Sequence, residues 1–345
     1  MILLANRINK HQIEEIAIEV TNKCFLNCCF CKHQKVSLGV QEEIPFELIR
    51  KLIDNIKSSL VPVVRITGGE PFLHSRIIDI LKYAKTKGLR VVLNTSASLP
   101  IDRQTLRVLE KCVDMILVSI QGYDKDSERR ITGTDKFFNS KLYNIRKLNS
   151  SNIKFVVLGT VISKMLIENW LRYSRLEKNL GVRYWSFFRP MVSSRNKLYS
   201  LKREDYVKFI NLISNLNSKE KRFLIFGLLP FCLSPDLKNT SLALASGNYN
   251  NGYSKLVWSL RGYYKPCYFI DIKLGKTIKE ALKHPYMRRL NSHNPIPYCK
   301  DCILWPICLG GSRFLAKTSY GSYFSPDPLA NRGNSLFSKV QTLKS

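Results

Sequence analysis

The sequence predicts an α/β fold: an open, partial (β/α)6 barrel of parallel strands, followed by a smaller, cysteine-rich C-terminal domain. Two observations lead to this prediction. Short runs rich in β-branched and aromatic residues alternate with longer amphipathic runs over the first two-thirds of the 345 residues. Most of the short runs lack polar–apolar alternation, as do parallel strands buried on both faces. Six units are too few for a closed eight-stranded barrel, and sheets of this type bind ligands at the C-terminal ends of their strands.

The elements follow one another as strand–helix pairs, which implies right-handed crossovers. The expected strands are 15–20, 61–67, 89–94, 113–120, 153–162 and 182–188. The expected helices between them are 45–58, 74–87, 102–111, 137–149 and 164–179, and a further helix is expected at 201–217. From residue 223 the helical periods become fewer, Gly, Pro and Asn more frequent, and half of the cysteines follow. We therefore expect a barrel domain at 1–222, an auxiliary domain at 223–318 and a loose tail at 319–345.

The composition restricts the class of protein. Lys and Arg number 55 and Asp and Glu 26, which gives a formal net charge of +29. Such an excess of positive charge favours binding to a nucleic acid, an acidic peptide or a phosphorylated substrate. The basic residues form no block, so compositional drift in a sequence rich in Asn, Ile, Lys and Ser is the alternative.

The chain shows no signal for export or for a membrane. The N-terminal apolar run has only four residues, and no run approaches the ~18 apolar residues that span a bilayer. We therefore expect a cytoplasmic protein. Disulfides are rare in that compartment, so ten cysteines indicate metal binding or catalysis.

Three cysteines directly follow the first expected strand. Cys24, Cys28 and Cys31 form the motif C-x3-C-x2-C. Three thiolates in one short loop suit a cubane 4Fe–4S cluster and leave its fourth iron open to another ligand. The alternatives are buried thiols or a zinc site with His33 as its fourth ligand. Cys29 lies outside the spacing and is expected to be a bystander.

The cysteine motif, with the aromatic Phe30 just before its last cysteine, resembles that of the radical S-adenosylmethionine (SAM) superfamily. The segment Gly68-Gly69-Glu70-Pro71 ends the second strand, where that family carries its GGEP motif. The resemblance implies that this segment binds the methionine amino group of SAM. Asn94 ends the third strand, like the family's turn that faces the SAM ribose.

The fourth strand ends in a further segment of this kind. Ser119 opens a stretch similar to the family's S-x-D-G, although Gln121 stands where the acid is usual. The resemblance implies that Ser119 meets the SAM carboxylate, helped by Arg129 or Arg130. A planar guanidinium suits a carboxylate, whereas an exposed helix face is the simpler role for each arginine.

The resemblance implies a reaction. A reduced 4Fe–4S cluster binds SAM, and one electron cleaves it to methionine and a 5′-deoxyadenosyl radical, which takes a hydrogen atom from the substrate. An acidic electron donor of the flavodoxin or ferredoxin type is the expected partner.

The C-terminal region holds a second set of five cysteines: Cys232, Cys267, Cys299, Cys302 and Cys308. The G-x4-C ending at Cys267 and the later C-x2-C-x5-C resemble the SPASM or twitch extension of radical SAM enzymes, which holds auxiliary 4Fe–4S clusters. Ser312 stands where the full SPASM pattern has a cysteine, and no cysteine follows Cys308. Five thiols suffice for one auxiliary cluster. Which four bind is open: the spacing favours Cys267, Cys299 and Cys302 as ligands, and Cys308 over Cys232 as the fourth. A zinc ribbon is the alternative. Cys112 precedes the fourth strand, at the end away from the site, and is expected to be structural.

Two groups of residues are candidates for further roles, and no catalytic residue is assigned. A base near the auxiliary cluster could be Tyr268, Asp271 or Asp301. The end of the sixth strand could line the substrate pocket or serve packing through Arg183, Tyr184, Trp185 and Arg189.

Several functions therefore compete. The first is modification or oxidation of a ribosomally made peptide or protein, with a separate leader-peptide-binding protein because the cysteine motif begins as early as Cys24. The second is oxidation or rearrangement of a small molecule such as a sugar, nucleotide or cofactor precursor. A nucleic-acid base is a third substrate class, supported by charge alone. A zinc-binding or electron-transfer protein without catalysis is the non-enzymatic alternative.

Overall fold

The computed structural model describes residues 13–31, 42–191, 197–216, 222–226, 229–233, 253–292, 296–300, 302 and 305–330. Within them, one nine-stranded sheet has the order β7-β6-β5-β4-β3-β2-β1-β8-β9. Its strands are β1 (Glu15–Thr21), β2 (Val63–Gly68), β3 (Arg90–Thr95), β4 (Met115–Ser119), β5 (Phe155–Val161), β6 (Tyr184–Phe188), β7 (Arg222–Phe226), β8 (Lys255–Trp258) and β9 (Tyr264–Lys265). All neighbours pair in parallel except β8 and β9.

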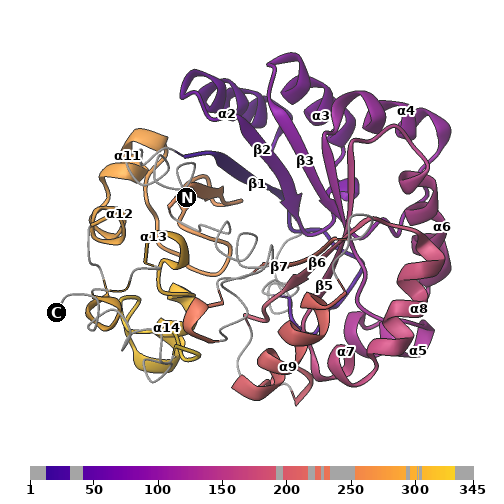
Figure 1. The fold of residues 1–345 in the computed structure, drawn as a ribbon. Coiled ribbons are helices and arrows are strands. Elements are labelled where there is room, and N and C mark those ends of the chain that lie inside the picture. The colour runs from indigo at the N-terminus through magenta and orange to yellow at the C-terminus, as the bar shows by residue number, and fades with distance from the viewer. Residues whose placement is uncertain are drawn as a thin grey trace.

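Helices cover the outer side of this curved sheet, as Figure 1 shows. They are α2 (Phe46–Ser58), α3 (Ile77–Thr86), α4 (Arg103–Cys112), α5 (Lys125–Thr132), α6 (Phe138–Asn149), α7 (Lys164–Glu168), α8 (Trp170–Leu180) and α9 (Arg203–Ser214). Residues such as Ile49 and Ile53 of α2 and Ile80 of α3 are fully buried against the strands. Burial of these apolar faces holds the layers together. The predicted α/β fold with a partial parallel barrel is therefore confirmed.

The barrel is larger than we expected. Six parallel strands were predicted, but β7 adds a seventh and β8 pairs in parallel with the other side of β1. Since β7 begins at Arg222 and β8 and β9 follow it, the sheet continues beyond the expected boundary at residue 222.

Short elements form the C-terminal region, to the left of the sheet in Figure 1. They are the helices α11 (Ile278–Lys283), α12 (Pro285–Leu290), α13 (Trp305–Cys308) and α14 (Arg313–Tyr320), with the 3-10 turns η4 (Phe231–Leu233) and η6 (Pro297–Cys299). The expectation of a loose tail from residue 319 needs correction for residues 319–330. There Asp327 is buried and pairs with Arg189 next to the end of β6.

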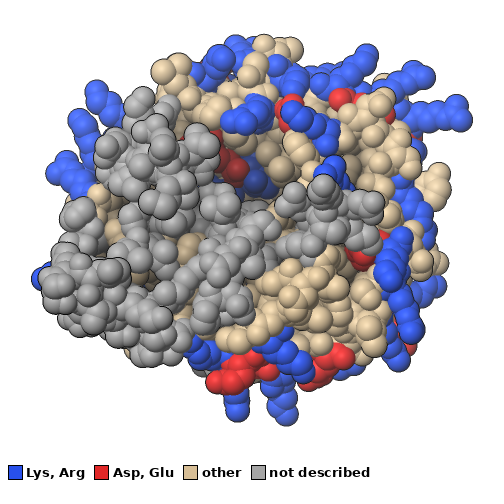
Figure 2. Space-filling view, viewed as in Figure 1, with Lys and Arg blue, Asp and Glu red and all other residues tan. Residues whose placement is uncertain are grey.

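Charge is spread over the surface. On the face in Figure 2, Lys and Arg project all around the rim, and Asp and Glu are far fewer. No helix in the part of the chain that the structure describes has the length and apolarity needed to cross a membrane.

Candidate functional site

The loop with the first three cysteines leaves the C-terminal end of β1 and rests on the end of helix α5. The backbone N–H of Asn27 donates to the carbonyl of Thr132 (2.8 Å), and that of Cys29 donates to the carbonyl of Ile131 (2.9 Å). The last carbonyls of a helix have no partner within the helix, so they are available to a neighbouring loop. The end of α5 therefore supports the cysteine loop.

The two glycines at the end of β2, Gly68 and Gly69, lie directly against the chain that leads into this loop. Gly69 N–H donates to the carbonyl of Thr21 (2.6 Å), and Glu70 N–H donates to that of Lys23 (2.8 Å). A Cβ on Gly68 would lie 2.3 Å from the Thr21 oxygen, and one on Gly69 would lie 2.2 Å from the Lys23 oxygen. Only glycine permits this approach. The Gly-Gly pair thus sets the position of the cysteine loop on the barrel.

The carboxylate of Glu70 is buried and joins the ends of β2 and β3. It accepts hydrogen bonds from Thr95 Oγ1 (2.6 Å), Ser96 N–H (2.8 Å) and Ser96 Oγ (2.6 Å). A carboxylate with this many donors is held in one orientation. Glu70 therefore orders the edge of the barrel on which the predicted GGEP segment lies.

Asn94 lies at the end of a chain of charged side chains inside the barrel. Its Oδ1 accepts from Arg65 Nη1 (2.9 Å), and Arg65 also donates through two nitrogens to both carboxylate oxygens of Glu15 (2.6 and 3.0 Å). Lys255 of β8 pairs with the same carboxylate at 2.7 Å. The Arg65 guanidinium therefore holds the Asn94 side chain in place.

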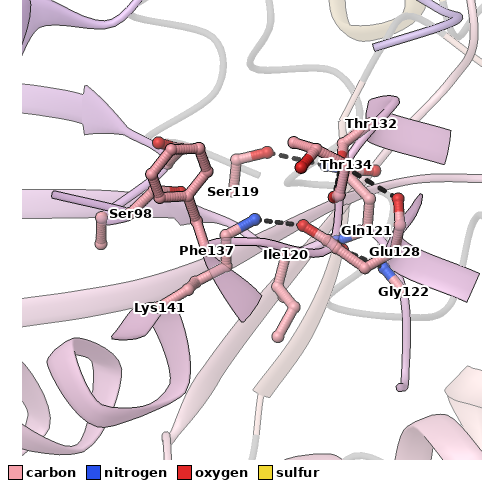
Figure 3. Close-up of polar contacts among 12 residues, drawn as sticks. Ser98, Ser119, Ile120, Gln121, Gly122, Glu128, Thr132, Thr134, Phe137 and Lys141 are labelled. Carbon is pink, nitrogen blue, oxygen red and sulfur yellow. Dashed lines mark hydrogen bonds and ion pairs between the residues drawn. The ribbon is translucent and has the colours of Figure 1, made fainter. Parts of the chain in front are cut away.

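The end of β4 is organised by Gln121 and by a buried ion pair. Gln121 Nε2 donates to Ser119 Oγ (2.8 Å), so the glutamine that departs from the expected acid orients the predicted carboxylate contact. Glu128 Oε2 accepts from Gly122 N–H (2.7 Å), while Glu128 Oε1 pairs with Lys141 (Figure 3). The two side chains are only 2% and 1% exposed.

The other predicted SAM contacts differ in their placement. Arg130 is exposed on α5, and Arg129 is exposed and pairs with Asp126 (2.7 Å). The ring of Phe30 packs edge-on against Tyr199, with their centroids 5.9 Å apart. Tyr199, which the sequence did not single out, closes one side of the cysteine loop.

The donor chemistry of the first loop fits a metal cluster. Burial, together with the neighbouring thiols of Cys31 and Cys24, holds the pKa of Cys28 well above its ordinary value of 9.0. Three thiolates this close therefore need a cationic partner, which iron supplies. Among the described residues no three Cys, His, Asp or Glu side chains converge to hold a single ion. The ligands of a cubane bind different irons and are not required to converge in that way.

Several of the C-terminal cysteines lie near one another. Cys308 Sγ accepts the N–H of Phe231 (3.4 Å), the residue before Cys232. Cys302 N–H donates to the carbonyl of Cys299 (3.2 Å). Cys267 and Cys112, the last residue of α4, are both buried in the hydrophobic core. The turn that holds Cys232 thus contacts the thiol of Cys308.

The candidate bases are spread apart. Asp271 is exposed and binds Arg261 (2.9 Å) and the hydroxyl of Tyr263 (2.8 Å). The ring of Tyr268 faces Lys255, whose Nζ lies 5.0 Å from the ring centroid. Asp301 and the possible zinc ligand His33 lie outside the described residues.

The residues around β6 serve packing more than they line a pocket. Trp185 is buried and donates to Thr160 Oγ1 (2.8 Å), and Arg183 is exposed beside the ring of Tyr184. Arg189 pairs with Asp327. Asp327, Glu128 and Lys141 carry no signal in the sequence, because an ion pair between distant residues has no local motif.

Comparison with protein-family models matches residues 18–172 to the radical SAM superfamily. Among curated proteins, an AdoMet-dependent heme synthase from Oleidesulfovibrio alaskensis is 22% identical over 337 residues, covering 91% of this chain and 86% of that protein.

Two solved structures show the same fold. Streptococcus suis SuiB bound to the precursor peptide SuiA has a TM-score of 0.71 at 18% identity, covering 95% of this chain and 78% of SuiB. anSMEcpe with bound AdoMet has a TM-score of 0.71 at 19% identity, covering 95% of this chain and 94% of that chain.

Proposed function

We propose a substrate class and a cofactor arrangement for this chain, which is a radical SAM enzyme with a cysteine-rich C-terminal region. Cys24, Cys28 and Cys31 hold a 4Fe–4S cluster, and the ends of β2, β3 and β4 bind SAM. When bound, the cluster and SAM supply a 5′-deoxyadenosyl radical that abstracts a substrate hydrogen. The substrate is a peptide or protein, which the enzyme modifies or oxidises.

One observation carries the cofactor assignment. The cysteine loop, Gly68-Gly69 and the end of helix α5 come from separate parts of the sequence and are joined by backbone hydrogen bonds at one end of the barrel. In this arrangement, Glu70 orders the turn after β2 and Gln121 orients Ser119. Arg65 holds the side chain of Asn94 in place. Residues of this chain thus provide contacts for the carboxylate and the amino group of SAM next to the cysteines.

Support for a peptide substrate comes from fold likeness to SuiB, whose structure holds a precursor peptide. A separate leader-binding protein and an acidic flavodoxin- or ferredoxin-type donor are part of this proposal. A second candidate is a small molecule. It is favoured by a relative named as a heme synthase, which aligns with 91% of this chain.

The cofactor assignment is tested with anaerobically reconstituted protein and dithionite as reductant. We expect reductive cleavage of SAM to 5′-deoxyadenosine, its abolition in Cys28→Ala and its retention in Cys112→Ala. Zinc without iron in the reconstituted protein, or full activity of Cys28→Ala, would contradict the assignment.

The substrate class is tested by mass spectrometry. A peptide encoded by a short reading frame next to this gene should change mass when SAM and reductant are present. Conversion of an iron porphyrin precursor, with no change in the peptide, would select the small-molecule candidate.

A further inference from the structure

We propose that Cys232, Cys299, Cys302 and Cys308 are the four ligands of one auxiliary 4Fe–4S cluster, and that Cys267 remains a protein thiol. This assignment rests on the proposed radical SAM function. It chooses among the five C-terminal cysteines, which the sequence spacing alone left open.

Cys232 is brought to Cys308 by the turn η4. Phe231 N–H donates to Cys308 Sγ, so the residue adjacent to Cys232 contacts the second thiol directly. The turn is held by Arg203 of α9, whose Nη2 donates to the carbonyls of Cys232 (3.2 Å) and Leu233 (2.7 Å). Phe231 and Cys308 are 77 residues apart in the sequence, and this hydrogen bond brings them into contact at the Cys308 thiol.

The other three ligands lie on consecutive turns of the chain. Cys302 N–H donates to the carbonyl of Cys299 (3.2 Å), and Trp305 N–H donates to that of Cys302 (2.9 Å). Helix α13 then ends at Cys308. Cys232 and Cys299 both lie close enough to Cys308 to interact with it electrostatically.

The segment after Cys308, which contains Gly311 and Ser312, is held by contacts with Asp327. Asp327 accepts from the N–H of Ser312 (2.7 Å), and a Cβ on Gly311 would lie 2.5 Å from Asp327 Oδ2. Ser312 Oγ accepts from Leu315 N–H and so caps α14. The hydroxyl that replaces the SPASM cysteine thus has a structural role, which fits a single auxiliary cluster.

Cys267 differs from the other four in its surroundings. It is 3% exposed and belongs to the hydrophobic core, together with Ile270, Leu274 and Met287. Its Sγ accepts the N–H of Ile270 (3.3 Å) within its own turn. The other four cysteines are half-buried and lie outside this core. A buried thiol of this kind packs as a small apolar residue.

The test uses the full chain with Cys24, Cys28 and Cys31 all changed to Ala, so that only C-terminal iron remains. After anaerobic reconstitution, we expect about four irons per chain and the electron paramagnetic resonance spectrum of a reduced cubane. Adding Cys267→Ala should leave the iron content and spectrum unchanged, as should the control Cys112→Ala. Adding Cys232→Ala should lower the iron content and change the cubane spectrum, because one iron loses its thiolate ligand.

A changed cubane spectrum in the Cys267→Ala variant with an unchanged one in the Cys232→Ala variant would overturn the ligand assignment. Loss of the cubane in both variants would overturn it as well. Circular dichroism and Cys232→Ser, which keeps the residue's size, separate lost ligation from lost folding. A background protein that binds no iron would overturn the auxiliary cluster itself. The proposed SAM chemistry is judged separately, by SAM cleavage in the protein with all its cysteines.

Discussion

Arg189 and Asp327, which are 138 residues apart in the sequence, form a buried ion pair with two hydrogen bonds. Arg189 Nη1 and Nη2 donate to the two carboxylate oxygens at 2.7 and 2.9 Å. The side chains are 2% and 0% exposed. Asp327 also accepts the N–H groups of Ser312 and Leu329. This pair therefore fastens the segment after Cys308 to the end of β6.

Replacing Asp327 with Asn should destabilise the protein by about 3–5 kcal/mol, because it leaves the Arg189 guanidinium buried without its counter-charge. Urea unfolding under anaerobic conditions would measure the loss, and limited proteolysis should show earlier cleavage within the C-terminal region. Asp126→Asn is the matched control. It removes an exposed pair with Arg129 and should cost less than about 1 kcal/mol. Equal losses in the two variants would contradict the fastening role.

Replacing Gly68 with Ala should displace the cysteine loop and lower the iron bound by the first cluster. The new Cβ would meet the Thr21 oxygen at 2.3 Å, and the backbone there cannot retreat without moving the loop. Gly181→Ala is the control, since Gly181 also has a positive φ (63°) but a Cβ there meets only the Asn149 amide at 3.7 Å. Iron per chain is the measurement. A normal iron content in Gly68→Ala would show that the close approach is not needed.

Replacing Glu70 with Gln should weaken SAM binding by roughly tenfold, the effect of losing about 1.4 kcal/mol. One oxygen of the carboxylate becomes an NH2 group, which faces donors on Thr95 or Ser96 instead of accepting from them. The dissociation constant of SAM, measured by equilibrium binding to the reconstituted protein, tests this prediction. The exposed Glu47→Gln should bind SAM as the unchanged protein does, and iron content should be normal in both.

The fold was predictable where each element has its own apolar signature. The expected strand at 89–94 corresponds to β3 and the one at 182–188 to β6, because buried parallel strands are continuous apolar runs. β7 was missed because it lies where the composition changes, at the expected domain boundary. β8 was missed because it has only four residues and lies in the region rich in Gly, Pro and Asn.

The site was predictable only as far as its local motifs extend. Cys24, Cys28 and Cys31 and the segment from Gly68 follow from spacing and from their places after strands. The partners that hold them do not. Lys141 reads as a surface lysine of an amphipathic helix, yet it is 1% exposed and pairs with Glu128. Asp327 lies in a polar stretch without periodicity, and only the tertiary structure gives it a partner.

Lys255 gives a pH-dependent prediction. Burial lowers its pKa from 10.5 to about 8, although the charge of Glu15 opposes the shift. In the unfolded chain an ordinary lysine keeps its proton up to about pH 10.5. Between pH 8 and 10.5 the unfolded state therefore binds more protons at this position, and its contribution to stability rises with pH.

Replacing Lys255 with Met removes that contribution while Glu15 keeps its two bonds to Arg65. The free energy of unfolding of Lys255→Met, relative to the unchanged protein, should therefore fall by up to about 3 kcal/mol between pH 7.5 and 10.5. Urea unfolding at several pH values measures this difference, and groups common to both proteins cancel. Lys82→Met should give a nearly flat difference, because the exposed Lys82 meets water in both states. A flat profile for Lys255→Met would mean that burial does not penalise its charge.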